Sequence, residues 1–328
     1  MRCISRAKSA ALVCVASISL FTGGCIGGKG ATPVTAYELK NYNQDLYQGK
    51  LYAEELCVAQ NDVALEGYTE DTELHSAALF DLTGERVLYS YKAHERLYPA
   101  STTKIMTALL AIENANLDDQ VTISGNADAS SFPADAQVCG LAKGEVWTLR
   151  DLLGALLLYS GNDAATAIAE YVGGSEEAFV NMMNRRAQEL MANGTHFMNP
   201  HGLHDDNHYT TAYDLYLIFN ECIKHEDFVN IIQSEAYTAY YTDVDGNSQE
   251  VLFTPTNLYA QGEVDVPENV TIVGGKTGTT DEAGYCLILM EKDSSDNPYI
   301  SIVMGASEKP VLYEDMTSLI EAIPSGQQ

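Results

Sequence analysis

The sequence predicts an α+β fold: one antiparallel sheet of about five strands, assembled from both ends of a domain, with flanking helices and a mainly helical insertion. Strand-like runs lie early and late in the chain, at residues 75–81, 86–91, 270–273, 285–290 and 299–304. Between them, from about residue 101 to 235, the pattern is mostly helical. Strands at both ends with helices between them are expected to pair into one sheet that carries the helices.

The sheet is expected to contain two hairpins. The first two runs are joined by residues 82–85, a short turn that contains Gly84. The last two are joined by a polar loop at residues 293–298. An amphipathic helix at residues 312–323 follows and closes the domain.

Capping residues mark the helices of the insertion. Thr148 and Asp151 form a capping box before a buried helix at residues 152–158. Ser175 starts another helix, which Gly194 is expected to close. Thr211 caps a third, which runs into Cys222.

Composition excludes several classes of protein. The 328 residues, 46% of them hydrophobic, can form one large domain or two ordinary ones. Lys and Arg total 18 against 46 Asp and Glu, for a net charge of −28. Nucleic acid and anionic lipid surfaces are therefore not expected as partners, because both are bound through clustered Lys and Arg.

The first 25 residues have the parts of an export signal: a basic start, an apolar run from about residue 10 to 21, and small residues before Cys25. They resemble a bacterial lipobox, although Thr22 stands where that pattern usually has leucine. We expect lipidation at Cys25, with plain secretion or an uncleaved anchor as alternatives; each places the protein outside the cytoplasm. Residues 26–72 are expected to be a tether and a peripheral segment, and residues 73–328 the catalytic domain.

The cysteines that follow Cys25 and one group of histidines are the candidates for metal or disulfide sites. The cysteines lack metal-site spacing, so buried free thiols are expected, with a disulfide left open: Cys57, Cys139, Cys222 and Cys286. The histidines occupy a segment with Pro200 and Gly202, which offers no regular helix to hold ligands. Loop packing rather than metal binding is expected for them: His196, His201, His204 and His208.

A Ser-x-x-Lys sequence, Ser101 to Lys104, is the strongest candidate for chemistry. Pro99 stops a helix from extending backwards, and residues 104–115 are strong helix formers. Helical spacing puts Lys104 on the face of Ser101, where a partly desolvated amine can take the serine proton. The helix N-terminus adds partial positive charge where an oxyanion would form.

Two further short motifs follow in order. Ser160-Gly161-Asn162 comes directly after the buried helix, and Lys276-Thr277-Gly278-Thr279 ends the 270–273 strand. Gly274 and Gly275 are expected to let another group approach that strand closely. Each motif alone is common, but their order and structural context together are not.

With these three motifs the chain resembles the penicillin-binding proteins and serine β-lactamases. Within that superfamily it is most similar to the low-molecular-mass D-alanyl-D-alanine carboxypeptidases (peptidase S11), across about residues 73–308. Four passages carry the likeness: residues 96–107, 160–165, 196–203 and 275–280. Members commonly have a second, β-rich domain; none is expected here, because the chain stops soon after its last predicted strand.

The resemblance implies a role for each motif residue. Ser101 would attack the penultimate D-alanine carbonyl of a stem peptide, with Lys104 as general base and Ser160 as proton relay. The other motif residues would bind substrate: Asn162, Lys276, Thr277, Gly278 and Thr279. Backbone N–H groups of Ser101 and Thr279 would form the oxyanion hole. No cofactor is implied, and β-lactams are expected as covalent inhibitors.

Two other functions remain open. One is an active-serine β-lactamase; the class A enzymes use a glutamate after the second motif, and residues 191–219 contain none. The other is a non-catalytic penicillin-binding or cell-wall lipoprotein. Turnover of a D-Ala-D-Ala peptide would separate the carboxypeptidase from both.

Overall fold

The computed structural model of the protein describes residues 55–65 and 76–324. The expected export signal, Cys25 and most of the expected tether lie outside the described residues. Residues 55–65 fold against the domain: the Cys57 N–H donates to the Tyr216 hydroxyl at 2.9 Å, and Val63 forms an isolated bridge with Ser90.

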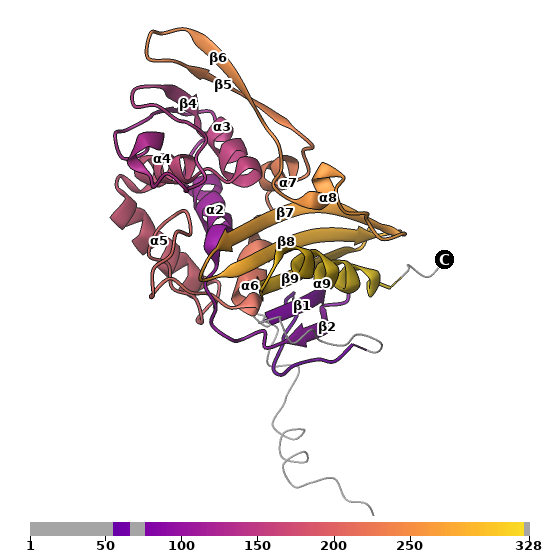
Figure 1. The fold of residues 1–328 in the computed structure, drawn as a ribbon. Helices are drawn as coiled ribbons and strands as arrows, with labels where there is room; N and C mark the ends of the chain where they lie inside the picture. Colours follow the sequence, from indigo (N-terminus) through magenta and orange to yellow (C-terminus); the bar gives the residue numbers. More distant parts are fainter. Residues whose placement is uncertain (1–54, 66–75, 325–328) are drawn as a thin grey trace, which may run out of the picture. The chain divides into compact units, whose positions relative to one another are not determined.

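A five-stranded antiparallel sheet from both parts of the chain forms the centre of the fold, as predicted (Figure 1). Its strands, in spatial order, are β2 (Arg86–Tyr91), β1 (Ser76–Asp81), β9 (Pro298–Ala306), β8 (Gly284–Asp293) and β7 (Val270–Thr280). The two expected hairpins are β1–β2 and β8–β9. Strand β1 is buried along its whole length because β2 and β9 flank it and its alternate side chains pack in apolar clusters on both faces of the sheet.

Helices cover both faces of this sheet (Figure 1). On β8, Leu287 and Leu289 pack in one apolar cluster with helix α9 (Lys309–Glu321). Ile288 and Met290, of the opposite parity, pack with the helical part of the chain. This alternation follows from the two-residue period of a strand. Helix α9 is the amphipathic helix that was expected to close the domain.

The helical part is built around α2 (Lys104–Asn114), whose first eight residues are all buried. The remaining helices follow along the chain: α3 (Leu149–Gly154), the π-helical turn η3 (Ala155–Tyr159), α4 (Asn162–Gly173), α5 (Glu176–Glu189), α6 (Ala212–Cys222), α7 (Glu226–Ile232) and α8 (Leu258–Gln261). The predicted caps hold for three of them: Thr148, Ser175 and Thr211 each accept a backbone N–H in the first turn. None of the helices in the described part of the chain is both long and apolar enough to cross a bilayer.

The expected end of α5 at Gly194 is wrong, since the helix ends at Glu189. Met191 adopts a left-handed conformation, with φ 61°. The Ala192 N–H donates to the Ala187 carbonyl at 2.8 Å and the Met191 N–H to the Gln188 carbonyl at 3.0 Å. This is a Schellman motif, which usually has glycine at the left-handed position; a methionine there gave no sequence signal.

A second, four-stranded sheet was not predicted from the sequence. Its strands, in spatial order, are β3 (Gln120–Thr122), β4 (Val146–Thr148), β5 (Tyr237–Thr242) and β6 (Ser248–Phe253). Strands β5 and β6 form a hairpin beside β4 and α3 (Figure 1). Its turn contains Asp245-Gly246, which together with the alternation of the flanking residues is a hairpin signal.

Two tyrosines of this hairpin contact neighbouring side chains. Tyr241 stacks on Trp147 with ring centroids 4.3 Å apart, and the Tyr237 hydroxyl donates to Asp151 at 3.0 Å. Tyr240 is 57% exposed. The four cysteines of the described part are free thiols, and burial raises the pKa of Cys57 and of Cys286 to about 11.

Candidate active site

Ser101 lies in a strained turn at the start of the central helix. A 3₁₀ turn, η1 (Ala100–Thr103), begins after Pro99 and continues directly into α2. Ala100 has a φ of 46°, which is unfavourable for a residue with a Cβ. Such strain is often found at functional sites, and here it precedes the candidate nucleophile.

The Lys104 amine faces Ser101 and is fully buried. Its Nζ lies 3.0 Å from Ser101 Oγ, 2.7 Å from Asn162 Oδ1 and 2.6 Å from the His201 carbonyl oxygen. Burial, and secondarily the positive charge of Lys276, hold the pKa of Lys104 well below its usual range. A neutral amine has two N–H donors and one lone pair. If Asn162 and His201 take the donors, the lone pair is left facing the serine hydroxyl.

The Ser160-Gly161-Asn162 motif is held by a buried carboxylate that the sequence analysis missed. Ser160 is left-handed (φ 71°) between η3 and α4. Asp163, at 0% exposure, accepts four backbone N–H groups, those of Cys139, Gly140, Leu141 and Ala164. This ties the loop that contains Cys139 to the start of α4 and fixes the motif between them.

Strand β7 carries the third motif along the other side of the site. Lys276 Nζ donates to Ser160 Oγ at 2.9 Å, and burial lowers the pKa of Lys276 to about 7. The motif lies within the strand rather than beyond residue 273, because β7 passes an irregularity between Ile272 and Gly274 and continues to pair with β8.

Three glycines allow β7 to pack tightly. A Cβ on Gly278 would lie 3.0 Å from the backbone nitrogen of Ser101, so the strand lies against the turn that carries the nucleophile. A Cβ on Gly274 would meet the Ile232 carbonyl oxygen at 2.0 Å, and one on Gly275 the Ile288 carbonyl oxygen at 1.9 Å. The close approach expected at Gly274 and Gly275 is therefore made by protein backbone.

The structure thus connects most of the predicted residues in two groups. Lys104 contacts Ser101 and Asn162, and Lys276 contacts Ser160. The candidate oxyanion donors, the N–H groups of Ser101 and Thr279, lie on segments that meet at Gly278. Thr279 is exposed, whereas the Thr277 hydroxyl bonds Thr256, a residue with no sequence signal, at 2.5 Å. Cys25 lies outside the described residues.

The D-alanyl-D-alanine carboxypeptidase family (peptidase S11) matches residues 64–308 of the chain. The chain belongs to this family. Carboxypeptidase DacF of Bacillus subtilis (strain 168) is 34% identical over 76% of the chain, and DacC of Escherichia coli (strain K12) is 31% identical over 74%. The chain spans only about three fifths of these relatives, 61% of DacF and 59% of DacC.

Solved structures agree with this assignment. The crystal structure of the Streptomyces K15 DD-transpeptidase superposes with a TM-score of 0.71 at 28% identity, covering 78% of this chain and 98% of that one. Penicillin-binding protein 5 of Haemophilus influenzae gives a TM-score of 0.68 at 27% identity, covering 78% and 72%. The S11 fold of this chain is therefore supported by both sequence and structure.

Two of the histidines of this S11 chain are buried and have hydrogen-bond partners in their loop. The Met198 N–H donates to His208 Nδ1 at 3.3 Å, which leaves Nε2–H to donate to Thr103 Oγ1 at 2.8 Å. The Leu203 N–H donates to His201 Nδ1 at 3.2 Å. Burial lowers the pKa of His201 to about 3 and that of His208 to about 4, so both are neutral at pH 7.

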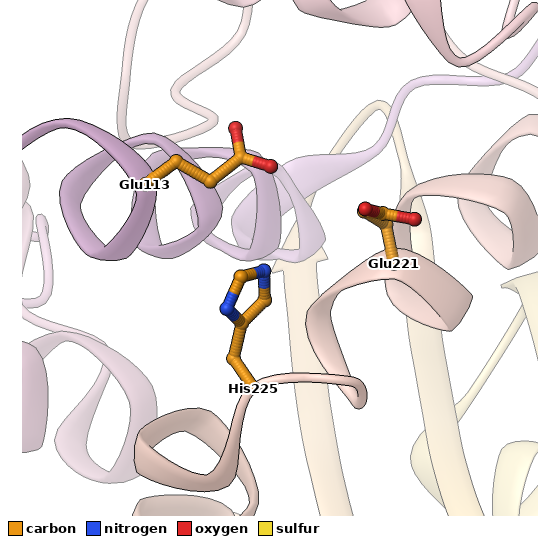
Figure 2. Close-up of side chains that lie close together, drawn as sticks. All are labelled: Glu113, Glu221 and His225. Atoms are coloured by element: carbon orange, nitrogen blue, oxygen red, sulfur yellow. The ribbon is translucent and has the colours of Figure 1, made fainter.

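A group of possible metal ligands converges away from the motifs (Figure 2): Glu113 of α2, Glu221 of α6 and His225 before α7. Their ligand atoms lie within 4.8 Å of one another. However, Arg186 donates to both carboxylates, at 2.6 and 3.0 Å to Glu113 and 3.4 Å to Glu221. Lys224 donates to Glu221 at 2.7 Å. Ion pairing therefore accounts for this cluster without a metal ion.

Proposed function

We propose that the chain is a serine D-alanyl-D-alanine carboxypeptidase, which removes the terminal D-alanine of peptidoglycan stem peptides through an acyl-enzyme on Ser101. The observation that carries the proposal is the placement of the buried Lys104 amine 3.0 Å from Ser101 Oγ, with acceptors for both of its N–H groups. Family membership and the names of the relatives support it.

Acylation begins at the carbonyl of the penultimate D-alanine. Ser101 Oγ bonds to the carbonyl carbon as its proton passes to Lys104 Nζ. The carbonyl oxygen becomes an oxyanion, which the N–H groups of Ser101 and Thr279 stabilise. Burial lowers the pKa of the Lys104 amine well below its usual range, which favours the neutral form that can accept the proton.

Collapse of the tetrahedral intermediate breaks the carbon–nitrogen bond. The departing D-alanine amine takes a proton from Ser160 Oγ, which is replenished from Lys276 Nζ, 2.9 Å away. Water then attacks the ester: its proton passes through Ser160 to restore Lys276, and the proton held by Lys104 returns to Ser101 Oγ as the carbon–oxygen bond breaks. An amine in place of water would give transpeptidation, the activity in the name of the similar Streptomyces K15 protein.

The same arrangement orients the substrate along β7. A leaving amine directed at Ser160 places the terminal D-alanine near Lys276 and Thr277, where a free carboxylate meets positive charge. The acyl half of the peptide then extends the other way, past Thr279 toward the β7–β8 turn. A cavity of about 590 Å³ lies at that end of the strand, lined in part by Tyr98 and Glu282.

D-Alanine release from an N-acylated Lys-D-Ala-D-Ala peptide, together with intact-protein mass spectrometry after benzylpenicillin treatment, tests the proposal. Wild-type protein should release D-alanine and gain one penicilloyl adduct on Ser101. Ser101→Ala should do neither. Ser234→Ala is a matched control, because Ser234 follows the end of α7 and its hydroxyl donates to the Asn230 carbonyl of that helix; it should behave as wild type.

Three outcomes would refute the proposal. Release of D-alanine by Ser101→Ala would rule out the serine mechanism. Rapid hydrolysis of benzylpenicillin without peptide turnover would identify a β-lactamase. An adduct without either activity would identify a penicillin-binding protein that is not a catalyst.

We also propose that the protein acts outside the cytoplasm, anchored through a lipid on Cys25. The support is the sequence of residues 1–25, with its basic start, apolar run and small residues before the cysteine. Metabolic labelling with a clickable fatty acid should mark the wild-type protein in the membrane fraction. Cys25→Ser should lose the label, and a label retained in that variant would refute lipidation at this residue.

A further inference from the structure

A tight turn at residues 199–203 is closed by a single side chain, that of Asn199. Its Oδ1 accepts the N–H of Gly202 at 2.7 Å and that of His201 at 3.3 Å. Its Nδ2 donates to the Leu203 carbonyl at 2.8 Å. Asn199 therefore ties together the first and last residues of the turn.

The turn lies against the segment that carries the nucleophile and base. The His201 carbonyl accepts the Lys104 amine at 2.6 Å, and the Pro200 carbonyl accepts the Thr107 hydroxyl, one helical turn later, at 2.6 Å. Gly202 has a φ of 90°, and a Cβ there would lie 1.9 Å from the Ala100 carbonyl oxygen. The position of the His201 carbonyl thus depends on how the whole turn is held.

This carbonyl determines how the Lys104 lone pair points. With Asn162 Oδ1 and the His201 carbonyl as acceptors, both N–H bonds of a neutral amine are used, and the lone pair faces Ser101 Oγ. If the carbonyl withdraws, one N–H loses its acceptor. The nearest replacement is Ser101 Oγ itself, and donation to it would turn the lone pair away from the proton that it must remove.

We propose that Asn199 is a positioning residue for acylation: by closing the 199–203 turn it holds the His201 carbonyl on Lys104 and so keeps the amine lone pair on Ser101. This inference rests on the proposed function of Ser101 and Lys104. The hydrogen bonds of the Asn199 side chain go to His201, Gly202 and Leu203 of the turn. Among the described residues, none goes to Ser101 or Lys104.

The test is the rate of acylation of the full-length protein by benzylpenicillin, followed by mass spectrometry over a range of concentrations and pH. Asn199→Ala should lower the limiting acylation rate about tenfold, the loss expected for one misplaced hydrogen bond. The concentration at half-maximal rate should change less than about twofold. Water entering beside Lys104 should also raise its pKa toward the ordinary value, so the acid limb of the rate profile should move to higher pH.

The substitution removes none of the other titratable groups that act on Lys104. They come from β7, α4 and the two neighbouring loops: Lys276, Asp163, Cys139, His201 and His208. A shift of the acid limb of the rate profile in Asn199→Ala therefore reports on a change in the position of the turn.

Asn184→Ala is a matched control, since Asn184 anchors the same loop farther from the site. Its side chain accepts the Phe197 N–H and donates to the Phe197 carbonyl, both at 2.8 Å, and it donates to the Val180 carbonyl at 3.1 Å. This variant should lose thermal stability without a change in limiting rate or acid limb. Thr107→Val removes the tie to Pro200 and should lower the limiting rate about threefold.

The results separate this inference from the proposed function. If wild-type protein gains no adduct and releases no D-alanine, the proposed function is wrong. If wild type reacts and Asn199→Ala has the same limiting rate and acid limb, or shares its changes with Asn184→Ala, the positioning role is wrong. Should Asn199→Ala not fold, Thr107→Val decides: an unchanged limiting rate overturns the proposal.

Discussion

Glu291 makes the stability of the fold depend on pH. It lies on β8 at 0% exposure, facing the α9 side of the sheet, and its Oε1 accepts a hydrogen bond from the Ser301 hydroxyl. Its Oε2 has no hydrogen-bond partner among the described residues. Burial raises the pKa of this carboxyl from 4.5 to about 8, so the folded protein keeps it protonated at neutral pH.

The magnitude follows from proton linkage. Because the folded-state pKa is the higher one, the stability present below pH 4.5 is lost as the pH rises toward 8 and then stays constant. Each pH unit in that window lowers the free energy of unfolding by about 1.4 kcal/mol, so the full loss of stability is about 5 kcal/mol. That is comparable with the whole free energy of unfolding of a marginally stable domain.

Glu291→Gln removes the ionisation while keeping the side-chain size and an acceptor for Ser301. Urea unfolding at pH 5, 6, 7 and 8 should show the variant gaining on wild type by about 1.4 kcal/mol per unit. Glu250→Gln, on an exposed position of β6, is the control and should show no such trend. A difference between Glu291→Gln and wild type that does not change with pH would refute the reasoning.

Three further predictions concern the site and its surroundings. Gly202→Ala should greatly slow acylation and lower the free energy of unfolding by about 3 kcal/mol or more, because the new Cβ would clash with the Ala100 carbonyl. The control is Gly246→Ala, at a similar φ of 83° but in open space; it should lower the free energy of unfolding by about 1 kcal/mol and leave acylation unchanged. As the pH rises above about 7, Lys276 loses its charge and acylation should slow, whereas Lys276→Arg should abolish this alkaline decline. Treatment with EDTA should leave the melting temperature unchanged, since Arg186 and Lys224 already neutralise the acids beside His225.

Each of these has a result that would contradict it. Equal losses in the two glycine variants would show that φ strain, not the close approach to Ala100, is responsible. An alkaline limb that persists in Lys276→Arg would assign it to another group. A fall in melting temperature on chelation, reversed by added zinc, would show that the Figure 2 cluster holds a metal.

Local patterns predicted the elements whose signals lie within a few residues. The hairpin of β1 and β2, the caps at Thr148 and Thr211, and the closing helix α9 were all expected, because turn chemistry, capping and periodicity act over short spans. The β3–β6 sheet was missed. Two of its strands have only three residues and pair across a long sequence separation, and the signal of its hairpin was overlooked.

The sequence by itself determined which residues we propose for the chemistry of the site. A serine and a lysine one helical turn apart, with Ser160, Asn162 and Lys276 in the expected order, already predicted an activated nucleophile and its partners. Their side chains carry the chemistry, so the residue types could be recognised without coordinates.

Only the tertiary structure decided the orientation and the pKa of the Lys104 amine beside Ser101. One of the two acceptors of the Lys104 amine is the backbone carbonyl of His201, a group that every residue type possesses. The cradle around Asp163 is likewise made of backbone N–H groups. Backbone groups leave no mark in a sequence, and the burial that lowers the pKa of Lys104 comes from distant parts of the chain. The fold therefore supplies the lowered pKa and the hydrogen-bond acceptors of a base that the sequence had already named.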